Sequence, residues 1–302
     1  MVETSQLQTL VAVAKARSFS KAAEELHVTQ SAISQSVKNL EKKLGVSLFR
    51  RSGKKVVLTG EGEKLYLLAN DFLGNLDDTL EDIQNDKGAM SGKIKVGTLN
   101  GVGKSWLAPE LMDHVSKNQD LKISIKLGFQ EDLVRDFENF RLDILILPED
   151  CLPNIGEKVF LSEERSTLVF SKAFEGQINT SINLKELSEF PTILFEDNDP
   201  LYLNWCRNRF KAIPKKINSR YVVNAHGNML QAVASGLGVA VVPTHVLNRS
   251  HLKSEVTTLG TEFEVLNGKF YLVYHKESKE LVRIEKTIER LMKSDNSLSK
   301  GI

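Results

Sequence analysis

A Gly-rich segment in the first half of the chain has the residue types of a phosphate site. An alternating apolar stretch, which includes Ile94 and Val96, leads into a loop that ends with Gly-Lys-Ser at residues 103–105. A phosphate-binding loop needs a Gly five positions before that Gly-Lys-Ser, so that a fixed number of backbone N–H groups surrounds the phosphates. Gly97 stands one residue too early, and Thr98 occupies the required position. The segment therefore predicts a turn from a strand into a helix rather than a nucleotide site.

The residue types that most often catalyse reactions or bind metals are scattered. The histidines follow no His-Glu-x-x-His pattern, and the chain has neither Gly-x-Ser-x-Gly nor Cys-x-x-Cys. We expect no metal site and no cofactor. The two cysteines, Cys151 and Cys206, lie far apart, and we expect reduced thiols because a lone cysteine is more often a small buried hydrophobe than a sensor. A redox role for either cysteine stays open as an alternative.

Residues 18–44 have the pattern of two helices around a tight turn. Ser18 or Ser20 can cap the first helix, and Thr29 can cap the second by accepting a hydrogen bond from a free backbone N–H group. Ala22 and Ala23 are small enough to let the two helices approach closely. One face of the second helix is apolar and is expected to pack inward, with Ile33, Val37, Leu40 and Leu44 at spacings of four, three and four.

The opposite face of this second helix carries side chains that can recognise DNA. At about 100° per residue, that face presents Ser31, Ser34, Gln35, Lys38 and Lys42. Gln can bond bidentately to adenine, Ser can bond several base edges, and Lys can contact phosphate or guanine. The alternative is an ordinary solvated helix face.

The charge of the chain is uneven, although its formal net charge is +1. Residues 1–60 contain ten basic and four acidic side chains, whereas residues 61–90 contain two basic and eight acidic ones. The basic segment ends in a short hairpin, residues 50–59, with Gly53 at its turn. This distribution indicates that the first sixty residues alone meet a polyanion.

These residues resemble the N-terminal signature of the LysR-type transcriptional regulators. The matching segments are residues 18–23, 26–34, 40–46, 48–51 and 58–62. In that family the block is a winged helix-turn-helix, so the resemblance implies that Thr29 to Leu44 is the recognition helix and Arg50 to Lys55 the wing. Ser31 stands where many relatives carry Pro. The expected DNA contacts are Thr29, Gln30, Ser31, Ser34, Gln35, Lys38, Arg50, Arg51 and Lys54.

Residues 63–87 predict one long helix with an apolar stripe. The stripe recurs at threes and fours without an interrupting Pro, and consists of Leu65, Ala69, Phe72, Leu76, Leu80 and Ile83. A helix of about 25 residues extends about 37 Å, too far to be covered by a sixty-residue head, so we expect the stripe to pair with another copy of the chain. Packing within the chain is the alternative. The resemblance implies a dimer, often within a tetramer, that holds two recognition helices on a roughly palindromic site of double-stranded DNA.

Strands and helices alternate after residue 92, which indicates a parallel α/β sheet. The expected strands are residues 93–97, 121–128, 143–148, 192–195, 220–224 and 238–243. The resemblance extends to this half through residues 142–146 and 232–243, and it implies an effector-binding domain with two α/β subdomains like those of periplasmic solute-binding proteins. It also implies that the chain crosses between the subdomains near Glu157–Ser162 and returns near Phe263–Phe270.

Ligands of such sheets gather where strand ends meet helix starts. We therefore expect a small polar or anionic effector in a cleft between the subdomains. By position, the expected effector contacts are Thr98, Leu99, Asn100, Gly101, Phe129, Gln130, Asn198, Asp199, Asn224 and His226. Each of these residues has a structural alternative, such as a helix cap, a core position or a turn.

The expected chain is α/β overall. Its parts are a winged helix-turn-helix at residues 1–60, a linker and dimerisation helix at 61–87, a hinge at 88–92 and an effector-binding domain at 93–302, in which subdomain I comprises 93–160 and 266–302 and subdomain II comprises 161–265. We expect a cytoplasmic protein, because no apolar run is long enough to span a membrane and the N-terminus lacks the features of a secretion signal.

The predicted function is transcriptional regulation by a homo-oligomer that binds specific DNA sequences and an unknown small molecule, without enzymatic activity. Three alternatives stay open. An enzyme would need Thr98, Asn100, Asp199 and His226 to converge as a proton-transfer group. A purely architectural DNA binder would fill the cleft with side chains. A peroxide sensor would need two closely spaced cysteines near residues 197–210, where only one cysteine occurs.

Overall fold

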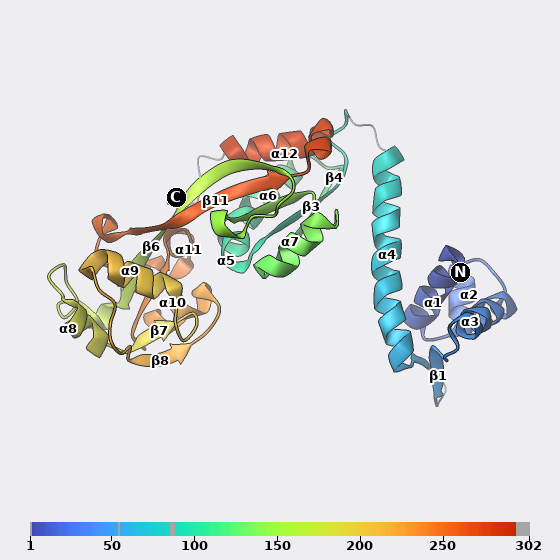
Figure 1. The fold of residues 1–302 in the computed structure, drawn as a ribbon, viewed down its shortest axis with the longest axis horizontal. Helices are drawn as coiled ribbons and strands as arrows, with labels where there is room; N and C mark the ends of the chain where they lie inside the picture. The colour runs from blue at the N-terminus through green and yellow to red at the C-terminus, as the bar shows by residue number, and fades with distance from the viewer. Residues whose placement is uncertain (1, 54, 85–87, 294–302) are drawn as a thin grey trace. The chain divides into compact units, whose positions relative to one another are not determined.

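The computed structural model describes residues 2–53, 55–84 and 88–293. The chain divides into two compact units, Met1–Asn85 and Asp86–Ile302. The elements of the first unit, coloured blue to cyan in Figure 1, are α1 (Thr4–Ala16), α2 (Phe19–Glu25), α3 (Gln30–Leu44), β1 (Phe49–Ser52), β2 (Lys55–Leu58) and α4 (Gly60–Gln84).

The predicted caps and helix packing of the first unit are confirmed. The Ser18 hydroxyl accepts a hydrogen bond from the Lys21 N–H at 3.4 Å, and the Thr29 hydroxyl accepts one from the Ala32 N–H at 3.2 Å. Because Ala22 is fully buried, α2 packs closely on its neighbours. The inward face of α3 joins the same core through the buried side chains of Ile33, Val37 and Leu40.

Leu44 differs from the rest of its stripe, because it is 39% exposed. It occupies the last turn of α3, and Gly45 ends the helix in the left-handed region at φ +71°. The stripe is therefore buried at its first three positions and exposed at its last.

The hairpin β1–β2 is tied to α3 by one carboxylate. The Glu41 carboxylate accepts hydrogen bonds from the backbone N–H groups of Leu48 at 2.7 Å and Phe49 at 3.3 Å. The two strands pair antiparallel from Phe49 with Leu58 to Ser52 with Lys55. This pairing forms the basic hairpin that the sequence predicts.

The long helix α4 begins at Gly60, three residues before the expected start. Its first half packs on the head, where Ala69 is 1% exposed and Leu65 and Leu73 contact the core of α1 and α3. Farther along, Phe72, Leu80 and Ile83 are exposed. The stripe is thus divided between packing within the unit and an uncovered surface.

The second unit contains one nine-stranded sheet. Its strands are β3 (Gly92–Leu99), β4 (Leu121–Gly128), β5 (Ile144–Pro148), β6 (Glu157–Ser171), β7 (Thr192–Leu194), β8 (Ser219–Val222), β9 (Val239–Pro243), β10 (Val256–Thr258) and β11 (Val265–Tyr274). Its α-helices are α5 (Asn100–Val102), α6 (Ala108–Ser116), α7 (Gln130–Glu138), α8 (Leu184–Glu189), α9 (Pro200–Phe210), α10 (His226–Ala234), α11 (Thr244–Asn248) and α12 (Val282–Lys293). A π-helical turn, η1 (Gly103–Leu107), joins α5 to α6, and two 3-10 turns, η4 (His251–Glu255) and η5 (Thr261–Phe263), flank β10.

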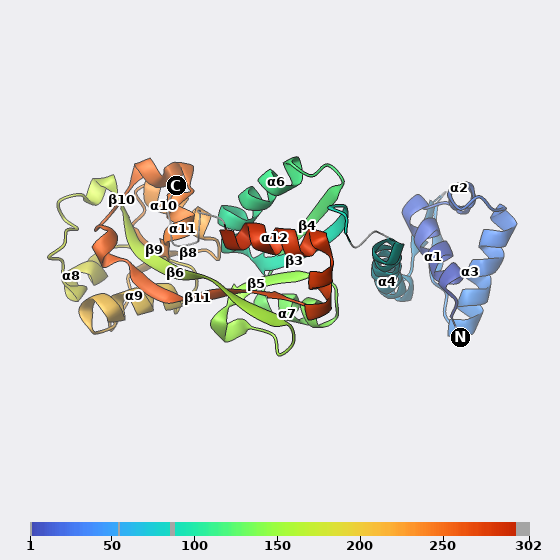
Figure 2. The ribbon, with the colours of Figure 1, turned by 90° about the horizontal axis from the view of Figure 1, so that it is seen from above.

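The strand order is β4-β3-β5-β11-β6-β9-β7-β8, with β10 beside β6. The outer strands on each side pair in parallel, as the sequence predicts. The sheet as a whole is mixed rather than parallel, because β11 is antiparallel to both β5 and β6 and β6 is antiparallel to β9. Figure 2 shows β6 and β11 running between the two ends of this unit. They are the two crossings expected near residues 157–162 and 263–270.

Helices cover both faces at each end of the sheet. At one end, α6 and α12 enclose one core and α7 encloses another, which centres on Leu133 and Phe137. At the other end, α8 and α9 lie over one core and α10 and α11 over another. The carboxyl ends of β3, β7 and β9 lead into α5, α9 and α11. Within the described ranges, every helix is too short or too polar to cross a lipid bilayer.

Candidate DNA-binding and effector sites

The face of α3 opposite the core is open to solvent. Thr29, Gln30, Ser31, Gln35 and Lys38 are exposed, and Ser34 is partly exposed. The opposite side of the helix is closed, because Ile33 is 2% and Val37 is 4% exposed. A helix with one face buried in its own domain and one exposed polar face can enter the major groove while the domain stays folded.

Short hydrogen bonds order the polar side chains on this face. The Ser20 hydroxyl donates to Gln30 Oε1 at 3.2 Å, and the hydroxyls of Thr29 and Ser31 lie 2.9 Å apart. Gln35 Nε2 donates to Asn39 Oδ1 at 2.9 Å. This bond uses one of the two amide N–H bonds of Gln35, so its second N–H and its carbonyl oxygen stay available for a base edge.

Two of the basic residues expected in the wing lie on β1. Arg50 and Arg51 are exposed on β1. Lys54 lies outside the described residues. The structure thus brings the exposed side of α3 and an exposed basic strand into one small unit.

The turn after β3 holds the first group of expected effector contacts, but its members differ in accessibility. Thr98 is fully buried, and its hydroxyl donates to the Ile146 carbonyl on β5 at 2.8 Å. That hydroxyl ties two neighbouring strands together. Leu99 and Gly101 are partly exposed and Asn100 is exposed.

Gly101 and His226 come together from distant parts of the sequence. A Cβ built on Gly101 would lie 3.4 Å from His226 Nδ1, and the His226 ring centroid is 4.7 Å from that of Phe195. Burial, with a smaller contribution from the nearby His245, lowers the pKa of His226 to about 4. The imidazole is therefore neutral near pH 7 and can donate one hydrogen bond and accept one. Asn224, two residues earlier, is exposed.

A polar triplet that the sequence analysis missed lies beside this contact. Ser105 Oγ is 2.7 Å from His245 Nδ1, and His245 Nε2 is 3.2 Å from Glu164 Oε1. His245 is 1% exposed. The Ser105 hydroxyl also contacts the Gly101 carbonyl at 2.8 Å. The triplet connects η1, α11 and β6, so it joins the Gly101 turn to the other end of the sheet.

Position in the chain gives a signal for two members of the triplet. Ser105 belongs to the Gly-Lys-Ser turn, and His245 follows the end of β9, so both lie where polar residues meet the carboxyl ends of strands. Glu164 lies inside the long strand β6, and its sequence position carries no such signal.

The remaining expected effector contacts start two other helices. Asn198 is exposed, whereas Asp199 is 1% exposed and its carboxylate accepts from the backbone N–H groups of Phe195, Leu201 and Tyr202. Burial raises the pKa of Asp199, and those three donors act in the opposite direction. Asp199 thus caps α9.

Phe129 and Gln130 mark the start of α7. Phe129 is 68% exposed, and Gln130 Oε1 accepts a hydrogen bond from the Cys151 thiol at 2.7 Å. Among the residues with described positions, no hydrogen bond joins Phe129, Gln130, Asn198 or Asp199 to Gly101 or His226.

Both thiols are held in their protonated form. Burial raises the pKa of Cys151 to about 11 and that of Cys206 to about 12. A thiolate is the reactive form of cysteine, so neither environment activates its sulfur. Within the described part of the chain, no three His, Cys, Asp or Glu side chains gather as a metal site.

Two family models match the chain. The model for bacterial regulatory helix-turn-helix proteins of the LysR family matches residues 4–63, and the model for the LysR substrate binding domain matches residues 87–295.

Individual relatives are similar over most of their length. The HTH-type transcriptional activator CmpR of Synechocystis sp. is 26% identical over 297 residues, which cover 97% of this chain and 96% of the relative. The HTH-type transcriptional regulator CfxR of Cupriavidus necator is 28% identical over 290 residues, which cover 91% of this chain and 86% of the relative.

Solved structures share the fold. Full-length CbnR, in a complex with its target DNA, has a TM-score of 0.65 at 20% identity and covers 96% of this chain and 99% of its own. CrgA, a LysR-type transcriptional regulator from Neisseria meningitidis, has a TM-score of 0.58 at 19% identity and covers 99% and 100%. The family matches identify transcriptional regulators rather than enzymes. This chain belongs to the LysR family and is a transcriptional regulator with a DNA-binding helix-turn-helix and an effector-binding domain.

Proposed function

We propose that the chain acts in the cytoplasm as a homodimer or homotetramer that recognises a roughly palindromic double-stranded DNA site through two copies of α3. The observation that carries this proposal is the division of α3 into a buried face, with Ile33 and Val37, and an exposed face, with Ser31, Gln35 and Lys38. Phosphate contacts would come from Arg50, Arg51 and Lys54, and base contacts from Thr29, Gln30, Ser31, Ser34, Gln35 and Lys38.

The exposed apolar side chains of α4 support pairing between two copies. Phe72 and Leu80 are each 46% exposed, and Ile83 is 75% exposed. A second α4 would cover them and hold two heads at a fixed separation. The domain scheme that accompanies this proposal has a head at 1–60, a linker at 61–87, a hinge at 88–92 and an effector domain at 93–302.

The effector would bind beside the turn at residues 98–101 and the start of α10, between the two ends of the sheet. The position of His226 beside Gly101, where an added Cβ would meet its Nδ1, supports this site, since the two residues are far apart in sequence. Exposed amides at Asn100 and Asn224 and the neutral ring of His226 offer donors and acceptors to a small polar or anionic molecule.

The response to the effector would be a shift between two arrangements. Binding would close the two ends of the second unit on each other, change how subunits pack, and alter the distance or angle between DNA-binding heads. Such coupling typically amounts to about 1–3 kcal/mol.

Footprinting of the intergenic region upstream of the gene tests this function, with the full-length protein and a set of central metabolites as probes. We expect two protected half-sites whose centres are separated by about one or more turns of DNA, roughly 34 Å each. One class of metabolite should change the length or the hypersensitive positions of the footprint. Protection of a single half-site, or a footprint that no metabolite changes, would oppose the proposal.

A matched pair of glycine variants locates the effector. Gly101→Ala places a methyl group 3.4 Å from His226 Nδ1, whereas Gly227→Ala meets no atom within 4 Å. Gly101→Ala should weaken the metabolite response and leave DNA affinity without metabolite unchanged, and Gly227→Ala should alter neither. An unchanged response in Gly101→Ala would place the effector elsewhere.

A further inference from the structure

A cavity of about 240 Å³ lies apart from the expected effector contacts. Its walls come from β6, α11, β10 and the turns η4 and η5, with Thr167 and Thr244 on the side of the sheet and Leu247 as an apolar wall. None of the ten expected effector residues lines it. Since one water occupies about 30 Å³ of liquid volume, the cavity has room for a small molecule in place of roughly eight waters.

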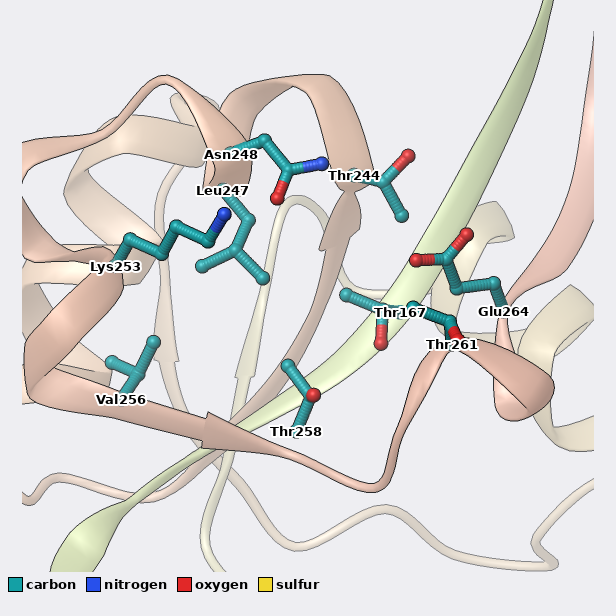
Figure 3. A pocket seen from close by; sticks show the side chains of 9 residues that line it. All are labelled: Thr167, Thr244, Leu247, Asn248, Lys253, Val256, Thr258, Thr261 and Glu264. Atoms are coloured by element: carbon teal, nitrogen blue, oxygen red, sulfur yellow. The ribbon is translucent and has the colours of Figure 1, made fainter. Parts of the chain in front are cut away.

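Two opposite charges face this cavity from opposite walls. Figure 3 shows Lys253 and Glu264 entering from the two sides, with Thr167 and Thr258 between them. Among the described residues, neither Lys253 nor Glu264 makes an ion pair with another side chain. Lys253 is exposed, so its charge is open to a ligand in place of water, and Glu264 is partly buried.

The cost of burying the Glu264 carboxylate is only partly offset by a nearby positive charge. Burial raises the pKa of its carboxyl group, and the positive charge of Arg165 acts in the opposite direction. The Arg165 guanidinium is itself engaged, because its Nη2 lies 3.4 Å from Glu163 Oε2. A partly buried carboxylate of this kind gains more from a ligand cation than an exposed one does.

The rest of the lining supplies neutral polar groups. Thr258, Thr261 and Asn248 line the cavity together with Thr167. Their side-chain polar groups have no hydrogen-bond partner among the residues that the structure describes. In Figure 3 the Asn248 amide lies above the space between Lys253 and Glu264. Hydroxyl and amide groups in such positions fix the orientation of a bound polar molecule.

We propose that this cavity is a second ligand site, which binds a small zwitterion such as a free amino acid. The Glu264 carboxylate accepts hydrogen bonds from the ligand ammonium group, and the Lys253 ammonium group donates to the ligand carboxylate. A ligand with a single charge fits less well, because it can pair with only one of the two protein charges. A bound amino acid contacts α11, η4 and η5 together, and so stiffens one end of the sheet.

Calorimetric titration of the full-length protein tests the proposal. The probes are glycine, L-serine, L-threonine, β-alanine and 4-aminobutyrate, which vary the distance between the two charges and the polarity of the side chain. Acetate and methylammonium carry one charge each and serve as controls. We expect saturable binding of at least one amino acid and no binding of either control at the same concentration.

Three variants assign the binding to this cavity. Glu264→Gln and Lys253→Gln each remove one charge, and each should weaken amino-acid binding at least about tenfold, the size expected when a charge-assisted hydrogen bond is lost. Glu262→Gln changes an exposed carboxylate two residues from Glu264 that does not line the cavity, and it should bind as the unaltered protein does. Circular dichroism and DNA binding without amino acid should match in all three.

Four results would overturn the proposal. In the first, no amino acid binds, and in the second both charge variants still bind. In the third, only one charge variant loses amino-acid binding, and in the fourth Gly101→Ala loses it while the charge variants keep it. Loss in one variant alone would mean that only one of the two charges of the amino acid is bound by this cavity, and loss in Gly101→Ala would mean that the amino acid occupies the effector position. None of these results alters the footprint expected without amino acid, so this inference and the proposed regulatory function fail separately.

Discussion

At the scale of single residues, two histidines of the second unit lie near the turn that follows β3. His226 contacts Phe195 and the Gly101 turn, and His245 bridges Ser105 and Glu164. Burial lowers the pKa of His226, so the protonation of this ring is coupled to the integrity of the fold.

This coupling predicts a pH dependence of stability. The pKa of His226 is lowered from 6.5 to about 4, so the unfolded chain binds more protons than the folded chain between those values. Stability from this residue is complete above about pH 6.5 and is lost as the pH falls towards 4. The loss should reach about 2–3 kcal/mol in the free energy of unfolding.

Thermal unfolding between pH 4.5 and 7 checks this prediction. His226→Phe keeps a ring against Phe195 without a titrating group, and it should reduce the loss of stability at low pH. His251 is exposed, so His251→Gln should leave the profile unchanged. Parallel profiles for the original protein and His226→Phe would show that His226 is not protonated on unfolding.

Residue types predicted part of the candidate sites and missed another part. The exposed face of α3 follows from helical spacing alone, because each position along a helix has a known direction. Thr98 and Asp199 were expected to contact the effector, yet their polar groups bond the Ile146 carbonyl and the start of α9. The bond between Ser105 and His245 spans 140 residues, and no local pattern encodes a contact of that separation.

At the scale of elements, the first turn of α4 packs closely against the hairpin. A Cβ built on Gly62 would lie 2.1 Å from the Leu48 carbonyl oxygen and 3.1 Å from Leu58 Cδ2. The first turn of α4 therefore approaches the hairpin backbone as closely as a glycine permits.

Gly62→Ala should loosen this junction. The methyl group cannot fit without a shift of backbone, so we expect a loss of about 1–3 kcal/mol in local stability. Hydrogen exchange of the backbone amides in α1 and α4 measures it. Gly60→Ala meets no atom within 4 Å and is the control. Equal protection in both variants would contradict a close contact at Gly62.

Elements were more predictable than their pairing. Caps at Ser18 and Thr29 and the hairpin with Gly53 follow from local side-chain chemistry and turn geometry. The antiparallel course of β6 and β11 does not, because their partners lie about a hundred residues apart in the chain, as in the pair Ser166 and Val265. The alternating pattern therefore predicted the parallel ends of the sheet and not its mixed centre.

At the scale of the whole molecule, the exposed stripe on α4 should determine assembly. Ile83→Asn together with Leu80→Asn removes two exposed apolar side chains from the stripe, and we expect a fall in molar mass by sedimentation equilibrium. Leu67 is 64% exposed but points about 200° away from Leu65 around the helix. Leu67→Asn should leave the mass unchanged. A fall in mass for Leu67→Asn and not for the double variant would assign assembly to another surface.

The central claim is that α3 recognises base sequence, and the ratio of affinities for the preferred site and random DNA tests it most directly. Arg51→Ala serves as the comparison, because removal of a phosphate contact should weaken both affinities alike. It should also lower the slope of log affinity against log salt concentration by about one. Gln35→Ala should weaken the preferred site by about 1–3 kcal/mol, roughly 5- to 150-fold, and leave random DNA unchanged. An affinity ratio that Gln35→Ala leaves unaltered would contradict the account.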